Sequence, residues 1–144
     1  MQEFYSYSAS DTEKIAADFA GNLKGNEVLA MFGTLGMGKT AFVRGLAKGL
    51  GNNSEISSPT FAIVHDYGGN PHLYHFDMYR ISTWDDLYST GFFDYLDMGG
   101  ILAVEWSENI ENVLPDGYIR IEFERGKNEN ERKITIYSPG EECT

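Results

Sequence analysis

The sequence of 144 residues contains a single cysteine, Cys143, and this scarcity excludes two kinds of chemistry. One cysteine forms no internal disulfide, and it is too few for a cysteine-based metal site. No apolar run approaches the ~20 residues that a membrane-spanning helix needs. Residues 1–14 lack the basic start and the apolar stretch of a signal peptide. We therefore expect a reduced, cytoplasmic protein that does not enter a membrane.

Basic residues are also scarce. Eleven Lys and Arg stand against 22 Asp and Glu, which gives a formal net charge of -11. Because affinity for phosphate backbones comes mainly from Lys and Arg, we expect no autonomous binding to nucleic acid. A basic protein is the more natural partner. With 42% hydrophobic and 14% aromatic residues, the chain can bury a core, and its length predicts one domain over residues 1–144.

Helical periodicity appears in two long segments. The first is expected to begin with Ser10 as N-cap and Glu13 as its capping-box partner, and to run to about Lys24. The second follows residue 39, and Gly51 is well placed just beyond its end. The acidic, aromatic connector 83–100 predicts one or two short helices, and another short helix is expected to end at Pro115.

Strand signals fill most of the remaining chain. The continuous apolar runs 27–32 and 101–106 are typical of strands buried on both faces. Residues 118–124 and 132–138 alternate apolar and polar side chains, which predicts a C-terminal antiparallel hairpin with one solvated face. Further strands are expected within residues 3–8, 61–67 and 72–81.

Residues 33–40, with the sequence GTLGMGKT, match the phosphate-binding pattern G-x-x-x-x-G-K-[ST] at every fixed position. A buried strand is expected before them and an amphipathic helix after them, which is the context that a P-loop requires. Glycines let backbone N–H groups turn inward around phosphate oxygens. Lys39 can reach the β- and γ-phosphates, and Thr40 can offer its hydroxyl to Mg²⁺. The predicted nucleotide-binding residues here are Thr34, Leu35, Gly36, Met37, Gly38, Lys39, Thr40 and Ala41.

Hydrolysis also needs a carboxylate for the metal and a group that places water. Asp77 lies in an otherwise apolar and aromatic segment, where burying a lone carboxylate is costly unless it is paired or serves a metal. The alternative is an ion pair, with Arg80 or another partner. Glu105 closes a buried-type strand, at the end where open α/β sheets place ligands. It is predicted to bind Mg²⁺ or orient water, with a plain surface carboxylate as the alternative. Trp106 is expected to cover the nucleotide or to close the core.

Two further observations concern the metal and the base of the nucleotide. His65, Asp66, His75 and Asp77 have spacings compatible with a transition-metal site, but His75 is more simply explained by packing or a hydrogen bond beside Asp77. The Asn-Lys-x-Asp element of guanine-specific GTPases is absent, and the D-x-x-G matches at 66–69 and 97–100 are weak. Adenine is therefore the expected base.

Several segments together resemble the TsaE (YjeE) family of small bacterial P-loop ATPases that support threonylcarbamoyl modification of tRNA adenosine beside the anticodon. The resemblance covers about residues 8 to 137 and is carried by the P-loop, SSPTFAIVHDY, LYHFDMYRI and GFFDYLDMGGILAVEWSE. It implies a single P-loop NTPase-like α/β domain with a mixed β-sheet flanked by helices. It also implies two partners, the transferase subunit TsaD and its companion TsaB.

The resemblance also implies roles for individual residues. Lys39 and Thr40 would bind phosphate and Mg²⁺, Thr60 would sense the γ-phosphate, and Asp77 would be an acidic metal-site residue. Glu105 would bind Mg²⁺ or assist hydrolysis, beside Trp106 close to the nucleotide. Thr12 and Arg132 would approach the base. The loop departs from the usual family pattern at two positions, Thr34 and Met37, where an acidic and a small residue are common.

Three functions follow as hypotheses. The first is a weak, partner-dependent ATPase that uses ATP and Mg²⁺ to drive turnover of the transferase complex, with Lys39, Asp77 and Glu105 as its catalytic residues. The second is a small-molecule kinase, which the acidic connector restricts to a neutral acceptor. The third is a non-catalytic module whose nucleotide state sets the affinity for a partner.

Overall fold

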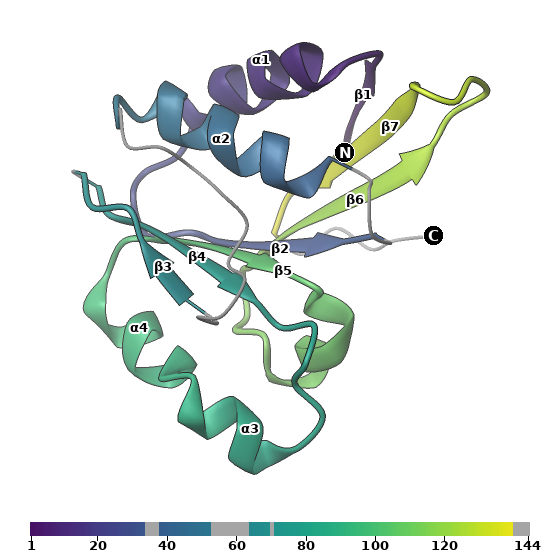
Figure 1. Cartoon of the computed structure of the whole chain (residues 1–144). Coiled ribbons are helices and arrows are strands. Elements are labelled where there is room, and N and C mark those ends of the chain that lie inside the picture. The colour runs from purple at the N-terminus through teal and green to yellow at the C-terminus, as the bar shows by residue number, and fades with distance from the viewer. Residues whose placement is uncertain (34–37, 53–63, 70, 140–144) are drawn as a thin grey trace.

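Figure 1 shows the fold of the protein, a computed structural model that describes residues 1–33, 38–52, 64–69 and 71–139. Seven strands form one mixed sheet in the order β1-β7-β6-β2-β5-β4-β3. Its centre is parallel, and both edges are antiparallel. The strands are β1 (Gln2–Ser6), β2 (Val28–Phe32), β3 (Val64–Asp66), β4 (Leu73–Asp77), β5 (Ile101–Glu105), β6 (Ile119–Arg125) and β7 (Arg132–Tyr137).

Helices cover both faces of the sheet (Figure 1). On one face lie α1 (Ala9–Ala20) and α2 (Lys39–Gly49). On the other lie α3 (Trp84–Ser89), α4 (Phe92–Met98) and the 3₁₀ helix η1 (Ser107–Val113). The expected α/β class, with a mixed sheet between helices, is confirmed. In the described part of the chain, no helix combines the length and the apolar character needed to cross a membrane.

The hydrophobic core consists of two clusters, one on each face of the sheet, because side chains along a strand point alternately to the two faces. Leu73 and Ile101 belong to the cluster that packs against α1 and α2, whereas Phe76 and Val104 belong to the cluster under α3, α4 and η1. Because neighbouring side chains on a strand point to opposite faces, every second residue faces the same helices. His75, Asp77 and Glu105 therefore point toward the face that carries α2.

The start of α1 differs from the predicted one. Ser8, not Ser10, is the N-cap: its hydroxyl accepts from Asp11 N at 3.0 Å, and Asp11 Oδ2 accepts from Tyr7 N at 3.0 Å. This pairing is a variant of the capping box, displaced by two residues, in which the carboxylate accepts from the residue before the N-cap rather than from the N-cap itself. The helix also ends earlier than Lys24, because Gly21 already forms its C-cap.

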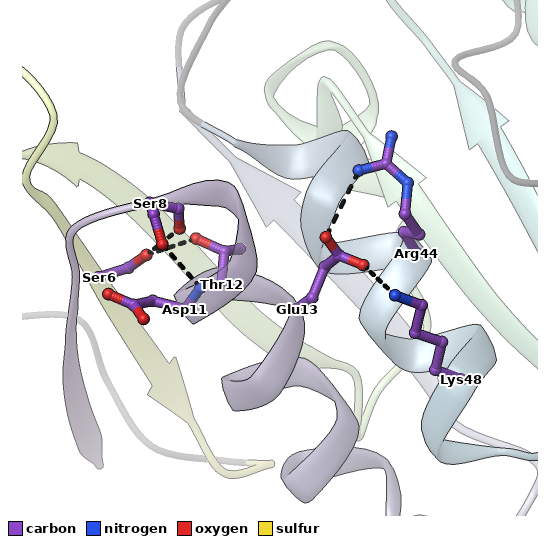
Figure 2. Close-up of polar contacts among 7 residues, drawn as sticks. All are labelled: Ser6, Ser8, Asp11, Thr12, Glu13, Arg44 and Lys48. Atoms are coloured by element: carbon purple, nitrogen blue, oxygen red, sulfur yellow. Dashed lines mark hydrogen bonds and ion pairs between the residues drawn. The ribbon is translucent and has the colours of Figure 1, made fainter.

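Glu13, the predicted capping partner, joins α1 to α2 instead. Its carboxylate lies 2.6 Å from Lys48 Nζ and 3.7 Å from Arg44 Nη1 (Figure 2). The two helices approach closely at the glycines of α2. A Cβ added at Gly45 would lie 2.2 Å from Glu13 O, and one at Gly49 would lie 2.5 Å from Ala17 O. These glycines therefore allow backbone-to-backbone contact.

Most other expected elements are present. The apolar runs form β2 and β5, whose residues are all buried, and Gly51 has a left-handed φ of 81° just beyond α2. β6 and β7 form the antiparallel hairpin, and β6 alternates buried with half-buried residues. The expected solvated face does not extend along β7, whose last four residues are all buried. The connector forms α3 and α4, while the segment before Pro115 is a 3₁₀ helix.

Candidate nucleotide-binding site

Lys39 begins α2, and residues 33–38 separate it from Phe32 at the carboxyl end of the central strand β2. Its Nζ donates a hydrogen bond to Gly33 O at 2.7 Å and lies 4.3 Å from the ring centroid of Trp106. The residue is only 4% exposed. Burial lowers the pKa of Lys39, while the charges of Glu105, Glu108 and Asp77 oppose that change. An ammonium group thus stands among three carboxylates at the end of the phosphate loop.

Asp77 and Glu105 end neighbouring parallel strands in direct register. Asp77 Oδ1 accepts from Tyr79 N at 3.0 Å, and Glu105 is 5% exposed. Burial and the nearby Glu105 charge raise the pKa of Asp77, against the opposing effects of the Tyr79 N–H, His75 and Lys39. Among the described residues no ion pair joins Asp77 to Arg80, so that alternative is not supported.

His75 is hydrogen-bonded to Glu105, whereas its effect on Asp77 is electrostatic. It is fully buried, and its Nε2 donates a hydrogen bond to Glu105 Oε2. Its other ring nitrogen, Nδ1, is buried without a hydrogen-bond partner in the described part of the chain. A single directional contact therefore holds the imidazole against the Glu105 carboxylate.

Trp106 turns the chain out of β5 with a φ of 58°, the only positive φ of a non-glycine residue among those described. Its ring lies 5.0 Å from the Tyr79 ring and beneath the Lys39 ammonium. This placement agrees with a position close to the phosphate loop. Strained backbone of this kind is concentrated at functional sites.

Glu108 is a site residue that the sequence reasoning missed. Its Oε2 accepts from Gly33 N at 3.0 Å, across 75 positions of sequence. Gly33 itself cannot be replaced easily, because a Cβ there would lie 2.9 Å from Phe123 O and its φ is 141°. The sequence signals for Glu108 were its place three residues after Glu105 and at the end of a segment that carries the family resemblance, and neither indicates a contact with the loop.

A second group of predicted residues lines a pocket of about 410 Å³ on the other side of Gly38. Thr12, Gly38, Ala41 and Arg132 all lie on its wall, together with residues of the β1–α1 turn. Ser6 Oγ donates to Ser8 O at 2.8 Å and lies 2.6 Å from Thr12 Oγ1 (Figure 2). Since Ser6 has one hydroxyl hydrogen, Thr12 supplies the hydrogen between them and keeps its own oxygen as an acceptor.

The structure thus brings the predicted residues into two adjoining groups. Lys39, Asp77, Glu105 and Trp106 surround the start of α2, and the pocket with Thr12 and Arg132 adjoins Gly38. Arg132 also donates from Nη1 to Glu129 O at 2.6 Å. Five predicted residues lie outside the described residues: Thr34, Leu35, Gly36, Met37 and Thr60.

The donor set is one that Mg²⁺ prefers, because the hydroxyl of Thr40 and the carboxylates of Asp77 and Glu105 supply oxygen atoms only. Burial and, to a smaller extent, the like charge of Glu105 raise the pKa of Asp77, and a divalent cation would favour the charged carboxylate. In the described ranges no cluster of three or more His, Cys, Asp or Glu side chains is arranged to hold a metal ion. A cation here would therefore need phosphate oxygens or water as further ligands.

Parallel strands that end at one sheet edge, with a phosphate-loop sequence between β2 and α2, define an α/β domain of the P-loop NTPase type. The sequence model of the family "Threonylcarbamoyl adenosine biosynthesis protein TsaE" matches residues 6–134. The chain belongs to the TsaE family.

Individual relatives agree with this assignment. The tRNA threonylcarbamoyladenosine biosynthesis protein TsaE of Aquifex aeolicus is 41% identical over 142 residues, covering 95% of this chain and 96% of the relative. The protein of the same name from Treponema pallidum is 36% identical over 131 residues, covering 91% and 96%. The crystal structure of Bacillus subtilis YdiB superposes with a TM-score of 0.77 at 34% identity, covering 96% of this chain and 86% of that one.

Proposed function

We propose that this protein is an ATP-binding, weakly hydrolysing subunit that supports threonylcarbamoyl modification of tRNA adenosine by driving turnover of the transferase complex. Membership of the TsaE family supports the pathway, since relatives carry that role in their names. The observation that supports the ATPase chemistry is the convergence of one buried lysine and two register-paired carboxylates on the loop between β2 and α2.

Lys39 would hold the β- and γ-phosphates once its ammonium exchanges Gly33 O for phosphate oxygens. Thr40, Asp77 and Glu105 are the residues that would hold Mg²⁺, which neutralises developing charge during phosphoryl transfer. Glu105 is also placed to orient the attacking water, because His75 fixes one of its oxygens. The base would enter the pocket beside Gly38, where Thr12 offers an acceptor and Arg132 a cation.

The acidic surface fits a protein partner better than an RNA one. TsaD and TsaB are the partners that this proposal assigns, with the transferase complex as the assembly whose turnover depends on ATP. The nucleotide then works as a switch, and a low rate of hydrolysis without partners is the expected behaviour.

The decisive experiment measures phosphate release from Mg²⁺–ATP by the protein with and without the purified TsaB–TsaD pair. We expect stimulation by the pair, loss of hydrolysis in Asp77→Ala, and loss of ATP binding in Lys39→Ala. The matched controls are Asp18→Ala and Lys14→Ala on α1, because both residues carry the same charges on exposed positions away from the site. Tight ATP binding with no phosphate release under any condition would leave the nucleotide-sensing module as the function. ATP binding and tRNA modification that survive Lys39→Ala would overturn the proposal.

A further inference from the structure

The helices α3 and α4 lie on the sheet face opposite α1 and α2 (Figure 1). They carry a cluster of three aromatic side chains, of which Trp84 and Tyr88 are exposed and Phe93 is half-buried. Trp84 is 59% exposed and Tyr88 is 66% exposed. Their ring centroids are 5.7 Å apart, and the Phe93 ring lies 6.2 Å and 5.4 Å from them. We call Trp84, Tyr88 and Phe93 the aromatic triad. Exposed aromatic groups of this kind are enriched where proteins bind one another.

A pocket of about 360 Å³ adjoins the aromatic triad. It lies between the start of α3 and the 3₁₀ helix η1, and Trp84 belongs to both the triad and the pocket wall. The wall combines apolar groups, Leu87 and Val113, with carboxylates, Glu108 and Glu111. A side chain that is flat, cationic and partly apolar would match every part of this wall.

The segment that contains α3, α4 and η1 carries only negatively charged side chains. Residues 81–119 contain no Lys, Arg or His, while their acidic residues are Asp85, Asp86, Asp94, Asp97, Glu105, Glu108, Glu111 and Asp116. A second copy of this chain would bring the same charge to the contact and be repelled. A basic partner surface is complementary, and charge complementarity selects partners and speeds their encounter.

We propose that the aromatic triad and its pocket form the docking surface for a protein partner that inserts an arginine side chain between Trp84 and Glu108. Arginine fits better than lysine, because its planar guanidinium stacks on an aromatic face and pairs with carboxylates at the same time. Arg120 of this chain already pairs with Glu111 at 3.0 Å, which leaves Glu108 as the carboxylate for the incoming arginine. The inference rests on the proposed function and names the contact chemistry of its partner.

Glu108 also connects this surface to the phosphate loop. Glu108 lines the pocket, and its carboxylate accepts a hydrogen bond from Gly33 N. An arginine that pairs with Glu108 would therefore compete with Gly33 for the carboxylate. Partner binding would then change the nucleotide affinity, and nucleotide would change the partner affinity by the same factor. The docking surface is therefore placed to sense or alter the occupancy of the site.

The test is calorimetric titration of the purified TsaD–TsaB pair into the full-length protein and its variants. We expect Trp84→Ala to weaken binding by roughly tenfold or more, as truncation of an aromatic anchor does, and Asp94→Lys to weaken it as well. Tyr5→Ala and Asp18→Lys are the controls, because Tyr5 is 51% exposed on β1 and Asp18 lies on the opposite face. Both controls should bind like the wild type, and added salt should weaken all binding.

Two results would overturn the docking surface. One is equal binding by the wild type, Trp84→Ala and Asp94→Lys, which would leave the proposed function intact if ATP hydrolysis is still stimulated by the pair. The other is a dimer of this chain, seen by sedimentation, that Trp84→Ala dissolves, because the occupant would then be a second copy. Trp84 is mostly exposed, so its truncation should leave the melting temperature near that of the wild type.

Discussion

The imidazole of His75 donates a hydrogen bond from Nε2 to Oε2 of Glu105, and both side chains are buried. His75 lies on β4 and Glu105 ends β5, two parallel strands that pair residue by residue. Both face α2, whose first residue is Lys39. Because His75 holds one oxygen of Glu105, the orientation of the whole carboxylate is fixed, including its other oxygen. A neighbouring hydrogen-bond donor positions a carboxylate for metal binding or catalysis in this way.

His75→Leu tests whether this contact matters. Leucine fills the buried site but gives Glu105 no donor, so we expect kcat for ATP hydrolysis to fall roughly 10–100-fold, with little change in the ATP dissociation constant. His75→Gln keeps an N–H donor at similar reach and should recover much of the rate. Phosphate release and calorimetric ATP binding measure the two effects separately.

A double-mutant cycle shows whether His75 acts through Glu105. In a Glu105→Gln background the carboxylate is already lost, so His75→Leu should cause little further loss of rate. Equal losses in both backgrounds would mean that His75 serves packing alone. A comparison of melting temperatures separates the two roles, because a packing defect lowers the stability in either background.

Much of the fold follows from local sequence. The apolar runs that form β2 and β5 are continuous and of strand length, which is typical of strands buried on both faces. The helix α2 combines helical periodicity with Gly51 just beyond its end. The start of α1 was displaced because two overlapping capping patterns occur there, and Asp11 rather than Glu13 completes the one that forms. The hydrogen bond from Tyr7 N to Asp11 accompanies the start of the helix at Ser8 rather than at Ser10, and the residue types alone do not indicate this bond.

The candidate site could be predicted only in part. Lys39, Asp77 and Glu105 were found because a motif and strand ends indicate them. The contacts of Glu108 with Gly33 and of His75 with Glu105 join residues distant in sequence, and they depend on the strand order. Pairing of β1 with β7 and of β6 with β2 is likewise a long-range result that periodicity does not encode. Those pairings place Arg132 near Thr12.

Asp77→Asn should stabilise the protein in the absence of nucleotide and Mg²⁺. Burial raises the pKa of Asp77 above its ordinary 3.8, so the wild type loses stability as the pH rises from 3.8 through the folded-state pKa, and the full cost of the charged carboxylate is present above it. We expect a melting temperature a few degrees higher than the wild type at pH 7. The gain should shrink as the pH falls through the folded-state pKa and vanish below 3.8, where the wild-type carboxyl is protonated in both the folded and the unfolded state.

Asparagine keeps the oxygen that accepts from Tyr79 N, so the substitution tests charge rather than shape. The control is Asp18→Asn on an exposed position of α1. A gain of the same size at every pH would show that the effect comes from something other than the Asp77 charge.

Arg132→Ala should weaken ATP binding if the pocket beside Gly38 receives the base. The expected loss is roughly tenfold, the size of a charge-assisted hydrogen bond. Arg125→Ala is a closely matched control, because Arg125 pairs with Arg132 in the β6–β7 register but does not line the pocket. Calorimetric titration with Mg²⁺–ATP gives the affinity. If the two variants bound ATP with equal affinity, the pocket beside Gly38 would not be the site of the base.

Gly45→Ala should destabilise the fold, although alanine is the better helix former by about 1 kcal/mol. A Cβ at Gly45 would lie 2.2 Å from Glu13 O and 2.7 Å from Ala16 Cβ, and the backbone oxygen cannot move aside like a side-chain tip. Overpacking costs about 1–3 kcal/mol beyond what repacking recovers, so the clash outweighs the propensity. The melting temperature should fall by about 2–4 °C for each kcal/mol lost. Gly21→Ala is the control, since its Cβ would meet only Asp18 O at 3.4 Å with ordinary helical φ. If Gly45→Ala melted at or above the wild-type temperature while Gly21→Ala did the same, α1 and α2 would have room to separate, and the close helix contact would not limit stability.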